Sequence, residues 1–531
     1  MRKVLDLGVA AILLAAAVVP FWLGRFFPFL DMPQHLALAA VVSHLGDSAT
    51  GFSRFYQIDP HITPYWGYYA AMWLFGHFAP LELANRLILT GYALGVPIAV
   101  GYALVSFGRD WRWAVFSVPL VFNTNLFLGF APFLVSIPLF LWALGLSERH
   151  LSEPALRLRC AVSLAVASMA VFLCHVETYL LLGMCVLILL AVHGQGLRWL
   201  AWRGAFYVPS LALFVTWAWR SFVNQDPASK QLHTVHHETF GTLRDLGAVY
   251  EPWRIVWSEM PRRLMGAFTD ASDQRIFLAW FLVAWIALFA CYGSCDGRLA
   301  AREDTARALS VRGDERTSLR ARLRALRCDL LVMSLVATYL FLPMQVSVQW
   351  YVNARYLVFS ALALPLLFAR RPTGRMTFLL GASAAIAVVA CANAGLKMRA
   401  FQRQAGDFGA IAAELPRGGR VLGLPFDKGV GGPVRLWPFL HWACYCQVAA
   451  GGDVGFSFAG LPSIPVRYRP GMQAPHPYEW RPDQFDWASM GSHYDAFLAS
   501  GRPQGRGGFE LIRHAVVVAQ SGPFTLWKPR R

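Results

Sequence analysis

The stretch Asp31-Met32-Pro33-Gln34-His35 places an acid, a proline and a histidine directly after a long apolar run. Proline is favoured in the first turn of a helix and aspartate is a common N-cap, so we expect an amphipathic helix over about Met32–Leu45 with Asp31 as its cap. His35 then lies one turn later on the same face, where it can orient Asp31, touch a phosphate or simply sit at the membrane interface. Asp31 can act as a general base, bind a metal ion or only cap the helix, and the sequence leaves these roles open.

Other polar side chains occur at the ends of apolar runs, where charge is costly and a functional role is the default expectation. They are Arg86, Asn123, Asn125, His175, Glu177, Gln349, Asn353, Arg355 and Tyr356. Arg86 and Arg355 can hold a lipid phosphate or extend to ordinary head groups. His175 and Glu177 can bind a metal ion or substrate hydroxyls, or form a hydrogen-bonded pair at a helix end. Asn123 and Asn125 are expected to be turn residues.

The segment His233–Glu238 contains a His-x-x-His spacing that can bind zinc on a helix. It departs from the His-Glu-x-x-His pattern of metalloproteases. A polar loop without a metal ion therefore competes with a metal site here.

Composition places these residues in a membrane. The chain has 531 residues, of which 56% are apolar, and a mean hydropathy of +0.42, which is too apolar for a soluble globule. Apolar runs of about 17 residues or more recur, the length needed to cross a hydrocarbon core of ~30 Å. The net charge of +17 comes mostly from loops between these runs, as the positive-inside bias produces, so it does not indicate nucleic-acid binding.

We predict an all-α polytopic membrane protein with about eleven transmembrane helices. The expected spans are 4–23, 85–107, 113–124, 126–146, 160–175, 177–193, 205–222, 276–293, 329–345, 355–369 and 376–396. The first span is read as uncleaved, with a cytoplasmic N-terminus, because no small-residue cleavage site follows it. The aromatic segment 65–78 is short for a crossing and is predicted to be juxtamembrane or re-entrant; a full crossing would invert everything after it.

In this topology the basic loops are cytoplasmic and the unusual polar residues gather on the extracytoplasmic side. The basic stretch Arg298–Arg327 is predicted to be an amphipathic helix that binds anionic lipid. Residues 1–396 form the transmembrane domain. Residues 397–531 are rich in glycine and proline and predict a small extracytoplasmic α/β domain, with a helix at 407–415, a strand at 420–426 and a strand pair over 515–527.

The pattern resembles the GT-C superfamily of polytopic membrane glycosyltransferases. The likeness lies in Asp31 within the first extracytoplasmic loop, the juxtamembrane helices, Arg86-Leu87 opening the second span, Arg355-Tyr356-Leu357, and the extracytoplasmic C-terminal domain. Asp31–Leu36 is also similar to an Asp-x-Pro-x-His-Leu signature of a bacterial branch grouped with this superfamily. A second acidic residue directly after Asp31, common in several branches, is absent, which leaves the metal and the sugar open.

The resemblance implies transfer of a sugar from a polyprenyl-phosphate donor to an extracytoplasmic glycan, lipid or protein at a bacterial inner membrane, with inversion. It implies catalytic roles for Asp31, as general base, and His35. Substrate-binding roles follow for Arg86, Arg355, Tyr356, His175, Glu177, and for Glu251 and Arg254 in a long loop that closes over the donor. A divalent metal ion as cofactor stays open. Two alternatives remain: a non-catalytic assembly or lipid-binding subunit of the same fold, and a transporter or flippase of lipid-linked or anionic solutes.

Overall fold

A computed structural model of the 531-residue chain describes residues 2–153, 155, 157–223, 248–293, 322–346, 349–368, 372, 374–461 and 464–530. The His-x-x-His segment at His233–Glu238 lies outside the described residues, as does most of the basic stretch Arg298–Arg327.

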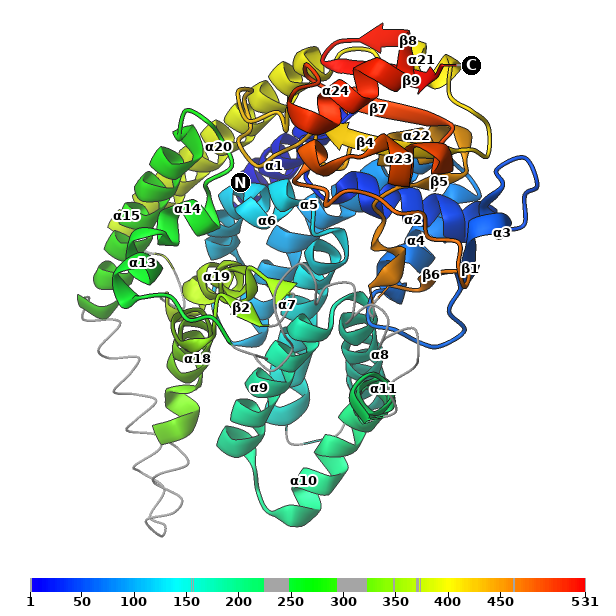
Figure 1. Ribbon diagram of the computed structural model, residues 1–531. Helices are drawn as coiled ribbons and strands as arrows, with labels where there is room; N and C mark the ends of the chain where they lie inside the picture. Colours follow the sequence, from blue (N-terminus) through cyan, green and yellow to red (C-terminus); the bar gives the residue numbers. More distant parts are fainter. Residues whose placement is uncertain are drawn as a thin grey trace, which may run out of the picture.

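Long apolar helices make up most of the molecule (Figure 1). They are α1 (Arg2–Val18), α5 (Leu81–Ser106), α7 (Ala131–Ser152), α8 (Leu158–Cys174), α9 (Val176–His193), α15 (Ser272–Gly293), α18 (Arg327–Phe341), α19 (Val352–Ala363) and α20 (Arg375–Ala405). Within the described ranges, α5, α7, α9, α15 and α20 are long and apolar enough to cross a membrane, and α1, α8 and α19 belong to shorter apolar helices. The chain is therefore an integral membrane protein. The total of about eleven crossings stays a prediction.

Two expected spans are not regular α-helices. The segment expected to cross at 113–124 consists of two 3₁₀ helices, η2 (Trp111–Ser117) and η3 (Pro119–Phe122). Pro119 lacks the N–H that a continuous helix would need at this point. The segment expected at 205–222 divides into η4 (Ala205–Tyr207), α11 (Val208–Ala218) and the π-helical turn η5 (Trp219–Val223).

Three shorter helices follow α1 and its 3₁₀ extension η1 (Val19–Trp22): α2 (Met32–His44), α3 (Phe52–Phe55) and α4 (Trp66–Gly76). The 11 residues of α4 extend about 16 Å, too short to cross the ~30 Å hydrocarbon core, as the juxtamembrane prediction requires. We expected α2 to be amphipathic, but Met32–Val42 is buried without interruption. The reason is that α2 packs between α4 and α22 (Cys444–Ala450), a helix of the C-terminal part.

The C-terminal part contains a five-stranded mixed sheet with the order β5 (Asp453–Val454), β4 (Arg420–Pro425), β7 (Ala496–Ser500), β9 (Phe524–Pro529) and β8 (Ala515–Ser521). The strands β5, β4 and β7 are parallel, with Val421 opposite Ala496, and β9 and β8 are antiparallel. Figure 1 shows the sheet at one end of the molecule and α10 (Leu197–Gly204) at the other. The expected strands at 420–426 and 515–527 correspond to β4, β8 and β9.

Shorter elements complete the fold. They are α6 (Thr124–Leu128), α13 (Trp253–Ser258), α14 (Met260–Leu264), η6 (Leu364–Leu367), α21 (Gly409–Ala413), η7 (Phe458–Gly460), η8 (Pro482–Gln484), α23 (Trp487–Met490), η9 (Gly491–His493) and α24 (Gly505–His514). Two small antiparallel pairs join β1 (Tyr56–Ile58) to β6 (Val466–Tyr468) and β2 (Gln345–Val346) to β3 (Gln349–Trp350).

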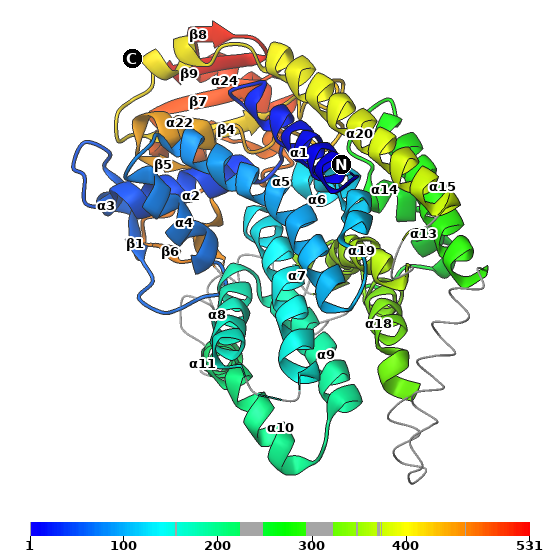
Figure 2. The same cartoon turned by 180° about the vertical axis from the view of Figure 1, so that it is seen from behind.

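The C-terminal sheet packs directly against the helices. Figure 2 shows α20 running beside α15 and reaching the sheet. It continues to Ala405, past the boundary expected at residue 396, and Gln402 Oε1 accepts hydrogen bonds from the backbone of Arg25 and Phe26. One hydrophobic core includes Val421 and Leu526 of the sheet together with the helices. The division into two domains at 396/397 stays a prediction.

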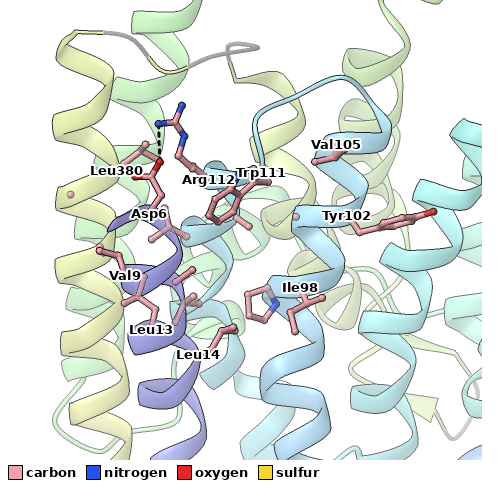
Figure 3. Close-up of a pocket in the computed structure, with 18 of the residues that line it drawn as sticks. Asp6, Val9, Leu13, Leu14, Ile98, Tyr102, Val105, Trp111, Arg112 and Leu380 are labelled. Carbon is pink, nitrogen blue, oxygen red and sulfur yellow. Dashed lines mark ion pairs between the residues drawn. The ribbon is translucent and has the colours of Figure 1, made fainter. Parts of the chain in front are cut away.

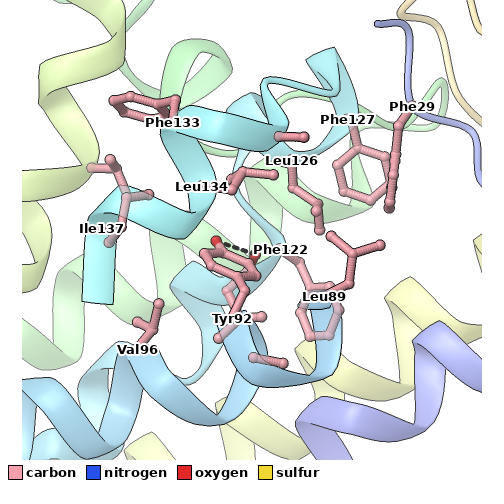
Figure 4. Packing of buried hydrophobic residues seen from close by; sticks show 14 of the residues in the cluster. Phe29, Leu89, Tyr92, Val96, Phe122, Leu126, Phe127, Phe133, Leu134 and Ile137 are labelled. Atoms are coloured by element: carbon pink, nitrogen blue, oxygen red, sulfur yellow. Dashed lines mark hydrogen bonds between the residues drawn. The ribbon is translucent and has the colours of Figure 1, made fainter. Parts of the chain in front are cut away.

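Aromatic side chains fill the core next to the segment that carries Asp31. In Figure 4, Phe29, Phe122 and Phe127 lie beside the part of α5 that carries Leu89 and Tyr92, and Tyr92 donates a 2.9 Å hydrogen bond to the carbonyl of Val121. Phe29 meets Phe127 edge to face, with ring centroids 5.5 Å apart. Burying one such side chain contributes about 1.5–3 kcal/mol, so this packing fixes the chain on either side of the first loop.

Candidate functional site

The backbone at Asp31 is held against the turn that follows α6. The amides of Leu30 and Asp31 donate 3.0 Å hydrogen bonds to the carbonyls of Phe127 and Leu128. Gly129 ends α6 with φ +77°, and a Cβ at this position would lie 2.6 Å from the Met32 amide nitrogen and 2.7 Å from that of Asp31. Only glycine combines this conformation with this close approach. The position of Asp31 therefore depends on Gly129.

The carboxylate of Asp31 is not used to cap α2. Asp31 occupies the N-cap position, but its side chain makes no capping hydrogen bond. Its Oδ1 instead lies 3.2 Å from Nδ1 of His441, and Nε2 of His441 lies 2.6 Å from Oε2 of Glu479. His441 Nδ1 also lies 3.2 Å from the carbonyl oxygen of Leu30. A buried imidazole from the C-terminal part thus connects two carboxylates.

The charge of His441 is set by these neighbours. Burial opposes protonation, but the carboxylates of Glu479 and Asp31 outweigh it and raise the pKa of His441 to about 10. His441 is therefore a cation at neutral pH. Its ring stacks on Phe456 at 5.7 Å, so both its charge and its orientation are fixed toward Asp31.

His35 lies on α2 next to this group but is neutral. Burial lowers its pKa to about 4, against the opposing effect of Asp31. Its Nδ1 forms a 2.8 Å hydrogen bond with the hydroxyl of Tyr69 on α4, and its ring packs edge-on against Phe458. His35 therefore ties α2 to α4 and to the C-terminal part.

A second charged group is formed by Arg355 and Glu177. Nη1 of Arg355 lies 3.3 Å from both carboxylate oxygens of Glu177, and Nη2 donates to the carbonyl of Trp350 at 3.1 Å. The guanidinium stands over the ring of Phe130 at 4.4 Å. Its Nε is buried and has no hydrogen-bond partner in the described part of the chain. Tyr356, the next residue on α19, interacts electrostatically with both members of the pair.

Tyr65 lies near both charged groups. Burial raises its pKa to about 12; Arg355 acts against this shift, whereas Glu177 and Asp31 add to it. Its ring stacks on His175 with a centroid distance of 5.5 Å. A partly buried, protonated phenol thus lies within electrostatic reach of both Asp31 and the Arg355–Glu177 pair.

His175 and Glu177 take separate roles rather than forming a pair with each other. The ring of His175 packs between Tyr65 and Phe133, and its Nδ1 lies 3.4 Å from the hydroxyl of Thr178. Glu177 faces Arg355. Both residues lie where α8 ends and α9 begins, as the sequence predicted for the outer turn.

The loop residues Glu251 and Arg254 differ in their surroundings. Glu251 forms an ion pair with Arg263 on α14, and Arg263 is buried with its Nη1 unpartnered among the described residues. The carbonyl of Arg263 accepts a 3.1 Å hydrogen bond from Tyr351, which directly precedes α19. Arg254 is exposed on α13. The loop therefore brings a second buried guanidinium to the start of the helix that carries Arg355.

Arg86 lies with the N-terminal segment. Its Nη2 donates to the carbonyl of Gly24 at 2.8 Å, and its guanidinium stacks on Trp22 at 5.3 Å. Within the described ranges no hydrogen bond or ion pair joins Arg86 to Asp31 or Arg355. The structure thus brings together Asp31, His35, His175, Glu177, Arg355 and Tyr356 and leaves Arg86 outside this group.

Several residues of the site were not singled out from the sequence: Tyr65, Tyr351, His441 and Glu479. Tyr65 begins a segment whose aromatic residues are typical of a membrane-interface helix, so nothing marks it as a site residue. His441 and Glu479 belong to no motif and come from loops of the C-terminal part, far along the chain from Asp31. A buried histidine flanked by tryptophan and leucine has no signature that distinguishes it from a core residue.

The described residues contain no group of three or more His, Cys, Asp or Glu side chains arranged to hold a metal ion. Both ring nitrogens of His441, the imidazole nearest to Asp31, face oxygen atoms of the protein. The residues present do not form a recognisable metal site around Asp31.

The chain is similar to several known structures. ArnT from Cupriavidus metallidurans bound to undecaprenyl phosphate superposes with a TM-score of 0.50 and 13% identity, covering 99% of this chain and 98% of that one. ArnT from Cupriavidus metallidurans in the apo state has a TM-score of 0.42 and 14% identity, covering 99% of this chain and 97% of that one. The arabinofuranosyltransferase AftD from Mycobacteria has a TM-score of 0.46 and 14% identity, covering 98% of this chain and 41% of that one. No protein-family model and no curated protein sequence matches the chain. The match to the first structure shows that this chain shares the fold of ArnT.

Proposed function

From this fold and the charged groups around Tyr65, we propose that the chain is a glycosyltransferase that moves a sugar from a polyprenyl-phosphate donor to an acceptor hydroxyl. The acceptor belongs to a glycan, lipid or protein on the extracytoplasmic side of a bacterial inner membrane, with the N-terminus in the cytoplasm. The observation that carries the proposal is that Asp31, paired with His441, and Arg355, paired with Glu177, both lie near enough to the partly buried phenol of Tyr65 to affect its pKa. ArnT, which shares the fold, binds undecaprenyl phosphate, and this supports a lipid phosphate as the donor carrier.

The proposed reaction is a direct displacement. The acceptor oxygen forms a bond to the anomeric carbon, the bond from that carbon to the phosphate oxygen breaks, and the polyprenyl phosphate leaves with the electron pair. The proton of the acceptor hydroxyl passes to the carboxylate of Asp31. Attack from the face opposite the phosphate inverts the anomeric centre. A positioned base contributes about 10²–10⁴-fold to such a step.

Asp31 is suited to this role by what surrounds it. Its carboxylate makes no hydrogen bond that caps α2 and is therefore available for the reaction. The His441 imidazolium holds this carboxylate in one orientation. His441 is itself anchored by Glu479. In the proposal, Asp31 is the catalytic residue, while His441 and Glu479 are positioning residues. His35, neutral and bonded to Tyr69, positions the helix that follows Asp31.

Arg355 is proposed to stabilise the leaving phosphate. Charge that develops on a leaving group is stabilised best by donors already fixed in place, and Arg355 is fixed by Phe130, Trp350 and Glu177. Its unpartnered Nε is one donor for a phosphate oxygen. Arg263, also with an unpartnered nitrogen, is proposed as the second cation.

The remaining residues are assigned to substrate binding. Tyr65 keeps its proton at neutral pH and can donate a hydrogen bond to the acceptor or to the leaving oxygen. The ring of His175 stacks on the ring of Tyr65 and holds it in place, and Tyr356 lies close to the Arg355–Glu177 pair. The loop with Glu251 and Arg254 is proposed to close over the donor, with the exposed Arg254 meeting the lipid phosphate first. No step of the proposal passes through a metal ion.

The test uses cells that lack the protein, complemented with wild type or with Asp31→Asn at matched protein levels, followed by mass spectrometry of lipid-linked sugars and surface glycans. The proposal expects a lipid-phosphate sugar to accumulate without the protein and a glycan to lose one residue, and expects only wild type to reverse both changes. Full complementation by Asp31→Asn would overturn Asp31 as the base and favour a non-catalytic subunit. Accumulation of donor on the cytoplasmic side alone would favour a flippase.

A further inference from the structure

A large cavity lies between the helices, away from the candidate site. It has a volume of about 700 Å³, is partly open at the surface, and is bordered by α1, α5, η2 and α20, with Arg149 of α7 also in its lining (Figure 3). The candidate site lies beyond the far ends of these helices, since Asp31 follows α1 and Gln402, near the end of α20, bonds to the backbone of Arg25. The cavity is therefore separate from the proposed chemistry.

The lining of this cavity changes from polar to apolar along α1 and α20. On α1 it runs from Asp6 to Leu14, and on α20 from Thr377 to Ala384. On α5 it includes Tyr102 and the apolar Val105 near the helix end, and Ile98 and Pro97 further from it. Eight residues of helix extend about 12 Å, less than half of the ~30 Å hydrocarbon core. The cavity thus has the polarity and depth of one leaflet of the bilayer.

Arg149 lies at the polar end of the cavity, and neighbouring side chains hold it in position. Its Nε donates to the hydroxyl of Ser106 at 2.9 Å, and its guanidinium lies 4.6 Å from the ring of Tyr102. Tyr102 stacks on Trp142 at 4.2 Å. Gly145 leaves room for this ring, because a Cβ there would lie 2.8 Å from Cδ1 of Tyr102.

Among the described residues, no acidic side chain balances the charge of Arg149. The other arginine of the cavity, Arg112, is held by both oxygens of Asp110 and by Asp6, an ion pair that is visible in Figure 3. No carboxylate pairs with Arg149 in the described part of the chain; its contacts are Ser106 and Tyr102. A fixed guanidinium with free donors at the polar end of an apolar cavity is complementary to a phosphate attached to an acyl chain.

We propose that this cavity binds one anionic phospholipid from the leaflet opposite the candidate site. Its phosphate is held by Arg149, and an acyl chain lies along Leu13, Leu14 and Ile98. An anionic head group is favoured over a zwitterionic one because it has no ammonium to repel Arg149. The bound lipid fills the space between α1, α5 and α20 and so supports the helices that end at the site.

Two variants separate the head-group contact from the tail contact. Arg149→Gln removes the phosphate contact and keeps a hydrogen-bonding side chain. Gly381→Leu places a side chain in the cavity from α20, where a Cβ has no neighbour within 4 Å, and leucine is also a better helix former than glycine. The matched controls are Arg159→Gln, at an exposed arginine, and Gly91→Leu, at an exposed glycine of α5 outside the cavity.

The experiment is native mass spectrometry of the purified, delipidated protein titrated with phosphatidylglycerol or phosphatidylcholine, with size-exclusion profiles as the check on folding. Wild type and both controls are expected to bind one phosphatidylglycerol at least roughly tenfold more tightly than phosphatidylcholine. Arg149→Gln is expected to lose this preference, and Gly381→Leu to lose binding of both lipids. Equal binding of both lipids by wild type, or an unchanged preference in Arg149→Gln, would overturn the proposal. Displacement of phosphatidylglycerol by polyprenyl phosphate would assign the cavity to the donor instead.

Discussion

Oδ1 of Asp31 lies 3.2 Å from Nδ1 of His441, although Asp31 belongs to the first loop of the helical part and His441 to the C-terminal part of the chain. The contact shows that neither part contains the complete site. Asp31 depends on the C-terminal part for its orientation, and His441 depends on Asp31 and Glu479 for its charge. The joint hydrophobic core and the buried helix α2 between the two parts hold this contact in place.

The first prediction concerns the proposed base. Asp31→Asn keeps the size of the side chain and can still accept a hydrogen bond from His441, so we expect the fold to survive. Loss of the base is expected to lower the transfer rate by about 10²–10⁴-fold. The measurement is transfer from a polyprenyl-phosphate sugar by protein in nanodiscs. Aspartate at the exposed position 47 serves as the control, and Asp47→Asn is expected to retain full activity.

The second prediction separates the phosphate-binding role of Arg355 from its role in folding. Arg355→Leu leaves the Glu177 carboxylate buried without its partner, which costs about 3–5 kcal/mol. The double variant Arg355→Leu/Glu177→Leu removes both charges and is expected to regain most of this stability. It is not expected to regain transfer, because the cation for the leaving phosphate is gone. Thermal unfolding in detergent and the transfer rate are measured in parallel; an active double variant would contradict the role of Arg355.

The third prediction concerns stability against pH. The pKa of His441 is raised from 6.5 to about 10, so its contribution to folding is complete below pH 6.5 and is lost as pH rises toward 10. The unfolding temperature is therefore expected to fall between these pH values. Glu479→Gln removes the main source of the shift and should flatten the curve. His493→Gln, at an exposed histidine of the same part of the chain, should leave it unchanged.

The sequence carries enough information for the helices and for the strands that are bounded by turns. Long apolar runs predict α5, α7 and α9 closely, and Ser521-Gly522-Pro523 marks the turn between β8 and β9. The irregular segments at 111–122 and 205–223 were missed because hydropathy does not distinguish an α-helix from a 3₁₀ or π turn. The burial of α2 was missed because the helix packs against α22, a contact between residues far apart in the chain.

In the candidate site, too, the sequence predicts some features and misses others. Asp31, Glu177 and Arg355 are charges at the ends of apolar runs, and this position alone makes them candidates. Their pairing is set by tertiary contacts: Arg355 pairs with Glu177, and Asp31 with His441. Arg86 has the same sequence context as Arg355, yet it bonds to Gly24 and stacks on Trp22. Local pattern identifies which side chains are costly to bury, whereas the fold decides which of them meet.

The last prediction concerns Gly129, which joins the backbone at Asp31 to the end of α6. Gly129→Ala has to place a Cβ within 2.7 Å of two backbone nitrogens and to keep φ at +77°, so the loop must move. Strain of this kind costs about 1–3 kcal/mol. Because Asp31 moves with the loop, we expect the transfer rate to fall by more than the loss of stability explains. Gly91→Ala is the control, since a Cβ there meets nothing within 4 Å and should leave both stability and transfer unchanged or slightly raise stability. If Gly129→Ala lowers the unfolding temperature but leaves the rate of the folded protein intact, the site tolerates displacement of Asp31 and its role as a precisely placed base is contradicted.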